Sequence, residues 1–147
     1  MTRRALLLLA IAGALSLGTA NARAGETVWS GLVMAENAAT PAAIPSELTP
    51  IEETLKELFG YNQFRVIGES RKALKTGEED WLASSKYFSL RVDLKGASPA
   101  GYVLNLKLFQ QNEVLLETDT KLSRSSPLII KGPQVGNGQL LLVLVVQ

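Results

Sequence analysis

The chain has 147 residues, of which 46% are hydrophobic and 20% are charged, so its composition is that of ordinary globular protein, most simply one domain. It contains no histidine and no cysteine. These two absences exclude a Ser-His-Asp relay, a cysteine nucleophile, a disulfide framework, and zinc, copper or haem sites of the common His/Cys kind.

The first 24 residues have the three parts of a secretory signal peptide. A positive head at residues 1–4 precedes an apolar stretch at residues 5–17, and residues 18–24 supply small side chains at signal-peptidase spacing. Cleavage is predicted after Ala24, or alternatively after Ala22. An uncleaved anchor is the other possibility, but the apolar stretch is short for a membrane span. Two adjacent arginines alone do not indicate twin-arginine export. We therefore predict export through the Sec pathway to the periplasm or the extracellular space.

Loss of this leader changes the charge of the protein. Arg3, Arg4 and Arg23 leave with it, so 15 basic residues become 12 while all 14 acidic residues remain, which leaves a net charge of −2. No basic cluster longer than Arg71-Lys72 remains, and the electrostatic footprint of a nucleic-acid-binding protein is therefore missing. Residues 25–147, the predicted single β-rich domain, must be stabilised by burial of apolar surface without disulfides.

The N-terminal part of this domain is predicted to be a strand followed by a connector. In residues 25–34, Val28, Leu32 and Met34 alternate with Trp29 and Val33, as in a β-strand. Residues 35–50 contain five alanines and three prolines, which predicts an irregular, extended connector.

One helix is predicted after the connector. Residues 49–52 match a capping box with proline at the first helical position. Glu52 and Lys56 have the spacing of a favourable i,i+4 pair, and Gly60 is expected to end the helix. The predicted apolar stripe consists of Ile51, Leu55, Leu58 and Phe59.

From Tyr61 onward the pattern is typical of strands and turns. The predicted strands include residues 64–67 (interrupted by Gly68), 87–95, 102–109, 114–122 and 127–131. The predicted turns or loops are residues 76–80, 96–101, 110–113, 123–126 and 132–138. Turn signals at nearly regular intervals favour an antiparallel β-sandwich or small barrel of about seven or eight strands, with one N-terminal helix packed on it.

The last seven apolar residues, 140–146, are the segment on which this fold is expected to depend. They lack period-two alternation, so neither face of the segment is suited to water. A membrane helix would need about 20 such residues. We therefore predict a central strand that is buried on both faces.

The strongest candidate for a binding site is the segment around Trp81. Trp81 directly follows Glu78, Glu79 and Asp80 at a predicted turn, and Tyr87 lies a few residues further on. Exposed aromatic rings could stack on a sugar while the carboxylates supply hydrogen bonds. The acids lack the spacing of a calcium loop. A solvated turn and a rim aromatic are the competing interpretation.

Other candidates have simpler structural explanations. Trp29 is aromatic but is placed in a predicted strand, where core packing is the usual role. Glu52 and Glu53 decorate the first turn of a helix, where negative charge is stabilising without any function. The glycine-rich residues 132–138 lead into a strand rather than a helix, so they do not match a phosphate-binding loop.

Two functions from different classes follow from these patterns. The first is a non-enzymatic exported module that binds another envelope or extracellular protein through a sheet edge or through the connector. The second is a carbohydrate-binding or weakly hydrolytic domain that uses Trp81 and Tyr87 with Glu78, Glu79 or Asp80. No cofactor, metal, nucleic-acid partner or catalytic residue is predicted, and the oligomeric state is not determined by the sequence.

Overall fold

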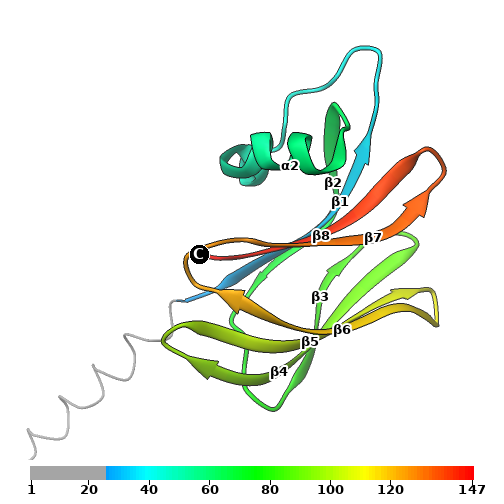
Figure 1. The fold of residues 1–147 in the computed structure, drawn as a ribbon. Coiled ribbons are helices and arrows are strands. Elements are labelled where there is room, and N and C mark those ends of the chain that lie inside the picture. Colours follow the sequence, from blue (N-terminus) through cyan, green and yellow to red (C-terminus); the bar gives the residue numbers. More distant parts are fainter. Residues whose placement is uncertain (1–25) are drawn as a thin grey trace, which may run out of the picture.

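The computed structural model describes residues 26–147, so the predicted leader lies outside the described residues. The described part folds into eight strands and one short helical segment (Figure 1). The strands are β1 (Val28–Glu36), β2 (Gln63–Lys72), β3 (Glu79–Ser84), β4 (Phe88–Ser98), β5 (Gly101–Gln110), β6 (Glu113–Ser123), β7 (Leu128–Val135) and β8 (Gly138–Val146). The helical segment is a 3₁₀ turn, η2 (Ser46–Ile51), that continues into α2 (Glu52–Phe59).

The strands form two antiparallel sheets that face each other. One sheet has the order β2-β1-β8-β7 and the other has the order β3-β4-β5-β6. In Figure 1 the helix covers the outer face of the first sheet, and the outer face of the second sheet is uncovered. The predicted antiparallel sandwich with one N-terminal helix is confirmed, and the barrel alternative is wrong because the two sheets remain separate.

Strand β8 is central in its sheet and buried on both faces, as its sequence predicted. It pairs with β1 on one side and with β7 on the other. Leu140, Leu142 and Leu144 point into the core between the sheets. Leu141 and Val143 point to the opposite face and pack beneath the helix. Both faces of β8 are apolar because the helix covers the face of the sheet that would otherwise be exposed to solvent.

The cluster beneath the helix explains why Trp29 is a core residue. The Trp29 side chain is fully buried, and its Nε1–H donates a hydrogen bond to Glu69 Oε1 at 2.9 Å. The indole lies over Gly31, where an added Cβ would come within 2.4 Å of Trp29 Cη2. The buried members of the cluster are Trp29, Val33, Ala35, Leu48, Leu55, Phe64, Leu141 and Val143.

The helix forms at the predicted place, but its start differs from the prediction. The predicted capping box is not formed. The Thr49 hydroxyl donates to the Pro45 carbonyl at 3.4 Å instead, and the helix begins with the 3₁₀ turn. Gly60 ends α2 in the left-handed conformation (φ +69°), as predicted, and its N–H donates to the Lys56 carbonyl. The Glu52–Lys56 ion pair is present at 2.8 Å. Leu58, predicted to be part of the apolar stripe, is 63% exposed.

Several strand boundaries differ from those expected at glycines. Strand β2 runs through Gly68, where the register with β1 shifts between Leu32 and Val33 instead of the strand ending. An added Cβ on Gly68 would lie 2.2 Å from the Ser84 carbonyl oxygen, so glycine here lets β2 cross close to β3. Strand β7 likewise continues through Gly132, which shortens the predicted loop to a turn at Gly136 and Asn137.

The predicted connector is only partly irregular. Its first two residues belong to β1, and its end forms η2. The segment between them is held by two side chains at the start of β2. Asn62 Oδ1 accepts the N–H of Ala38 at 2.9 Å, and Gln63 Oε1 accepts the N–H of Ala42 at 2.8 Å.

Glu26, which precedes β1, is hydrogen-bonded to two residues of the opposite sheet and its loops. Glu26 accepts hydrogen bonds from Arg124 Nε and Nη2 at 2.9 and 3.0 Å and from the Tyr102 hydroxyl. The Arg124 guanidinium lies 4.7 Å from the centre of the Tyr102 ring. The hydrogen bonds from Arg124, and then that from Tyr102, lower the pKa of Glu26 below its ordinary value.

This arrangement predicts that part of the acid sensitivity of the fold comes from Glu26. A carboxyl group whose pKa is lower in the folded protein stabilises the fold above its unfolded pKa, and this stabilisation is lost as the pH falls through the folded pKa. The melting temperature of Glu26→Gln should therefore fall less than that of the wild type between about pH 5 and pH 3. Thermal unfolding followed by circular dichroism measures this. Glu57→Gln, on the exposed side of α2, is the control and should keep the wild-type slope, whereas equal slopes for all three proteins would contradict the prediction.

Candidate functional site

The structure places the five predicted site residues in three different locations. Trp81 lies in β3 and is 45% exposed on the outer face of the sheet β3-β4-β5-β6. Glu79 lies two residues earlier on the same strand and therefore shares this face. Strand β3 itself was not predicted, because its first residues were assigned to a turn.

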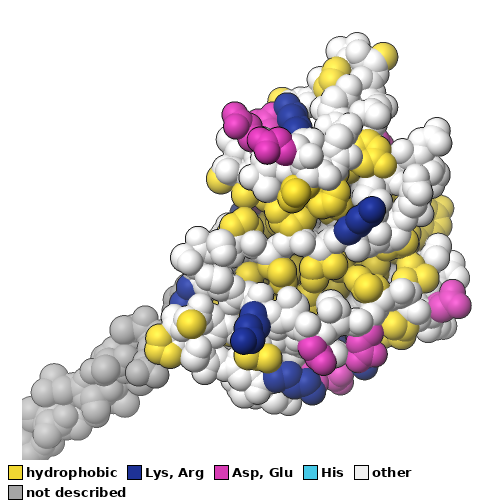
Figure 2. Space-filling model, in the orientation of Figure 1, with side chains coloured by type: hydrophobic (Ala, Val, Ile, Leu, Met, Phe, Trp, Pro, Cys, Tyr) yellow, Lys and Arg dark blue, Asp and Glu magenta, His cyan; other side chains and the backbone are white. Residues whose placement is uncertain are grey.

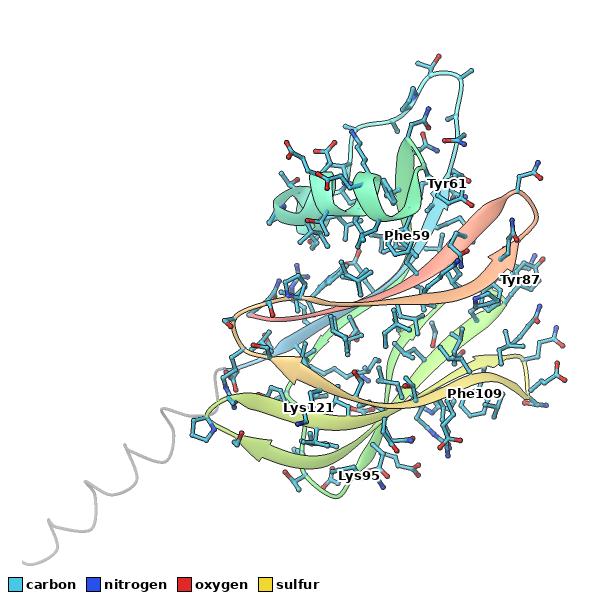
Figure 3. The ribbon with its side chains drawn as sticks, in the orientation of Figure 1. Phe59, Tyr61, Tyr87, Lys95, Phe109 and Lys121 are labelled. Carbon is cyan, nitrogen blue, oxygen red and sulfur yellow. The ribbon has the colours of Figure 1, made fainter. Side chains whose placement is uncertain are left out.

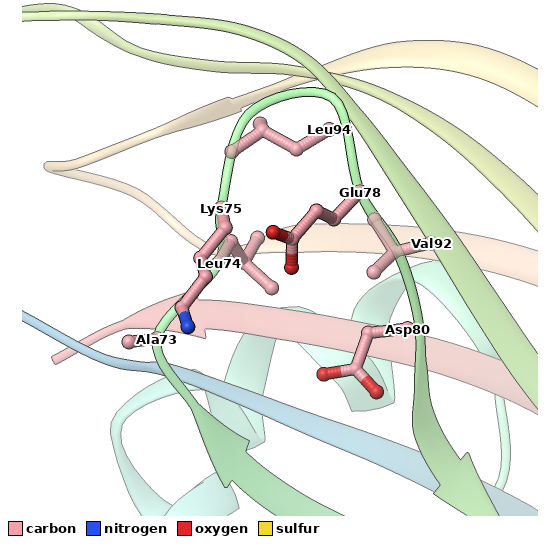
Figure 4. Close-up of a pocket in the computed structure, with 7 residues that line it drawn as sticks. All are labelled: Ala73, Leu74, Lys75, Glu78, Asp80, Val92 and Leu94. Carbon is pink, nitrogen blue, oxygen red and sulfur yellow. The ribbon is translucent and has the colours of Figure 1, made fainter.

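Glu78 and Asp80 lie on the other side of β3, at the edge of the sandwich. They line a cavity of about 100 Å³ together with Lys75 and the apolar side chains of Val92 and Leu94 (Figure 4). Asp80 Oδ1 accepts hydrogen bonds from Lys72 Nζ at 3.1 Å and from the N–H of Trp81 at 2.8 Å. Such a cavity is below the several hundred Å³ of a typical ligand site, and Asp80 has a structural partner.

Tyr87 lies in the connection between β3 and β4 and is 53% exposed. Its ring faces the Lys86 ammonium at 5.4 Å. The aromatic partner of Trp81 is Phe109 on β5, with ring centres 5.4 Å apart and planes inclined by 59°. Figure 3 shows Tyr87 and Phe109 in separate positions near one end of the sandwich. Trp81 and Tyr87 therefore do not form the aromatic pair that the sequence suggested.

Instead, strand pairing assembles a site around Trp81 from three strands. Trp81 is paired with Arg91 on β4, and Arg91 is paired with Lys107 on β5. The Arg91 guanidinium lies 5.5 Å from the centre of the Trp81 ring and 5.2 Å from that of Phe109. We call Trp81, Arg91, Lys107 and Phe109 the aromatic–cation site.

The two cations of this site have few partners among residues 26–147. The one ion pair within 4.0 Å joins Arg91 Nη2 to Glu79 Oε2 at 3.6 Å, which is beyond hydrogen-bond distance. Lys107 is paired across the sheet with Glu117, but Glu117 Oε2 accepts a hydrogen bond from Asn105 Nδ2 at 3.0 Å instead. Like charges directly opposite each other on neighbouring strands are unfavourable. Among residues 26–147, Arg91 therefore has one long ion pair and Lys107 has none within 4.0 Å, which leaves both side chains able to bind a further anion.

A second candidate surface is the exposed edge of β7. Figure 2 shows hydrophobic side chains gathered on both sides of this strand, toward the helix and toward β6. On the side of β6 they include Leu115, Leu116, Leu128, Ile130 and Val135, all partly buried. On the side of the helix they include Ile44, Ile51, Phe59 and Ile129, also partly buried.

The regular part of this edge is short. The pairing of β7 with β8 is regular from Leu128 to Lys131 and shifts before Gln134, and Pro133 in the shifted part has no N–H to offer. We call residues 128–131 the β7 edge. Lys131 is its charged member, and residues 127–146 contain no other charged residue.

The described part of the chain has no group of three or more potential His, Cys, Asp or Glu ligands that could hold a metal ion. Within residues 26–147, no helix is both long and apolar enough to span a membrane. Comparisons with protein-family models, curated proteins and solved structures found no significant match to this chain.

Proposed function

We propose that this protein is a non-enzymatic exported module that binds another envelope or extracellular protein by adding an extended segment of that protein to the β7 edge. The observation that carries the proposal is the presence of partly buried apolar side chains on both faces of an edge strand. An exposed edge offers unpaired N–H and C=O groups to a further strand.

The surroundings of β7 define the chemistry of the partner. A strand added to an ordinary edge would bury one face. Here apolar side chains lie on both sides of β7, so an added strand would contact both sets (Figure 2). The partner segment should therefore be apolar on both faces, as β8 is. It should also carry a carboxylate near Lys131. A second copy of β7 has no acidic residue to offer, which disfavours self-association through this edge.

The test is capture of partners by the full chain carrying a C-terminal tag, in extracts of the envelope and of the medium. Ile129→Lys places a charge on the β7 edge and should reduce recovery of the partner by about tenfold or more. Val114→Lys introduces the same charge at an exposed position of β6 and is the matched control. Thermal unfolding of both variants checks that they are folded. Equal recovery with wild type and Ile129→Lys, or no specific recovery at all, would count against the proposal.

The exposure of Trp81 favours a second candidate function, which is carbohydrate binding on the outer face of the sheet β3-β4-β5-β6. A half-exposed indole on the outer face of a sheet can stack on the C–H face of a sugar ring. Glu79 shares this face, whereas Glu78 and Asp80 line the cavity on the other side of β3. The separation of these carboxylates favours binding over hydrolysis, which needs two carboxyl groups on either side of one bond.

Titration of the full chain with neutral and acidic polysaccharides, followed by tryptophan fluorescence, tests this second function. Trp29 is fully buried, so a change in emission on binding reports on Trp81. An emission spectrum that stays constant with every polysaccharide would eliminate carbohydrate binding at Trp81.

A further inference from the structure

We infer that the aromatic–cation site binds an acidic sugar, a uronate residue of an acidic polysaccharide. This inference rests on the second candidate function above and adds the class of sugar. It depends on four side chains from three adjacent strands, of which the sequence alone singled out only Trp81.

The two aromatic rings provide an apolar surface of limited size. The Arg91 guanidinium lies over both rings, at 5.5 Å from the centre of Trp81 and 5.2 Å from that of Phe109, so the three side chains form one cluster. Trp81 remains 45% exposed despite these contacts. The exposed part of an indole matches the C–H face of a single sugar ring.

The two cations determine the charge of the ligand. Arg91 and Lys107 are directly opposite each other on β4 and β5, and their repulsion is relieved only in part by Glu79 at 3.6 Å from Arg91. Because Lys107 has no ion pair within 4.0 Å among residues 26–147 and Arg91 has only the long one, a carboxylate placed between them would accept hydrogen bonds from both side chains.

The acidic residues around the site limit how much negative charge a ligand can carry. Glu79 lies on one side of the cation pair and Glu117 on the other, where it is paired with Lys107. A polysulfated glycan, which carries several negative charges per ring, would be repelled by these carboxylates more strongly than a uronate, which carries one. A sugar with one carboxylate per ring fits both the charge and the aromatic wall.

The inference is tested by titrating the full chain with a galacturonate hexamer and with its fully methyl-esterified form, at low salt, by tryptophan fluorescence. The two probes have the same rings, and only the first carries charge. The free acid should bind at least about fivefold more tightly than the ester. Arg91→Gln and Lys107→Gln should each remove most of this preference, and binding of the acid should weaken as sodium chloride is added.

Lys121→Gln is the matched control, because Lys121 is on the same face but is paired with Val103, toward the other end of the sheet from Phe109 (Figure 3). It should keep the wild-type preference. Equal binding of acid and ester would overturn the inference while leaving carbohydrate binding intact. Binding of neither hexamer would overturn the inference, and the polysaccharide titration above decides separately whether Trp81 binds other sugars. Tighter binding of a poly-glutamate peptide than of the hexamer would assign the site to acidic protein instead and also overturn the inference.

Discussion

Removal of residues 140–147 should abolish cooperative folding of the protein. The deleted residues form most of β8, which is the hydrogen-bonded neighbour of both β1 and β7. Leu140 to Leu144 are all fully buried and contribute to both hydrophobic clusters. Without β8, the two remaining neighbours would expose backbone groups and apolar side chains together. Thermal unfolding and the dispersion of amide signals in nuclear magnetic resonance spectra measure the effect.

Removal of Gln147 alone is the control for this truncation. Its N–H donates to the Thr27 carbonyl at 2.8 Å and its side chain accepts from Arg71 at 3.1 Å, so its loss removes terminal contacts but no buried apolar surface. This shorter deletion should unfold cooperatively with a modest decrease in melting temperature. A truncation at residue 139 that still unfolds in one sharp transition would show that β8 is not the centre of the fold.

Replacement of Trp29 by alanine should lower the free energy of unfolding by about 3–5 kcal/mol, the usual cost of removing a large buried aromatic side chain. Trp29 fills the space between β1 and the helix, and Gly31 has no side chain that could take its place. The substitution also leaves Glu69 without its hydrogen-bond donor. Urea unfolding followed by circular dichroism gives the difference, since the variant has lost one of two tryptophans.

Trp81→Ala is the matched control, because it removes the same side chain from an exposed position. It should cost about 1 kcal/mol or less, since about half of that surface already faces water and only the contacts with Arg91 and Phe109 are lost. Similar losses for the two variants would contradict the assignment of Trp29 to the core and of Trp81 to a surface site.

The positions of the buried strands could be predicted because they depend on local pattern. Phe88, Leu90, Val92 and Leu94 alternate with polar residues, and all four are buried in β4. The predictions that were wrong had two causes: a contact between strands overrode a local signal at Gly68, and a competing local turn replaced the cap at Thr49. Gly68 is usually a reason to end a strand, but here it permits the approach of Ser84. The predicted cap at Thr49 is replaced by a 3₁₀ turn that hydrogen-bonds back to Pro45.

The candidate site was predictable only in part. The acidic residues before Trp81 predicted that its side chain is exposed, and it is. The same residues were interpreted as a turn, so strand β3 was not predicted. Alternation placed Arg91, Lys107 and Phe109 on outward-facing positions of their strands. It did not indicate which strands are neighbours or in what register they pair, so the three residues could not be assigned to one site.

The sequence by itself determined a mainly β antiparallel fold, the doubly buried last strand, and the helix with its glycine stop, because each follows from the spacing of apolar and special residues along a short segment. It left a sandwich and a small barrel open. Only the tertiary structure decided which edge stays open and which side chains meet around Trp81. Strand order and register depend on contacts between residues far apart in the chain, and a shift of one residue would have turned Arg91 and Lys107 into the core.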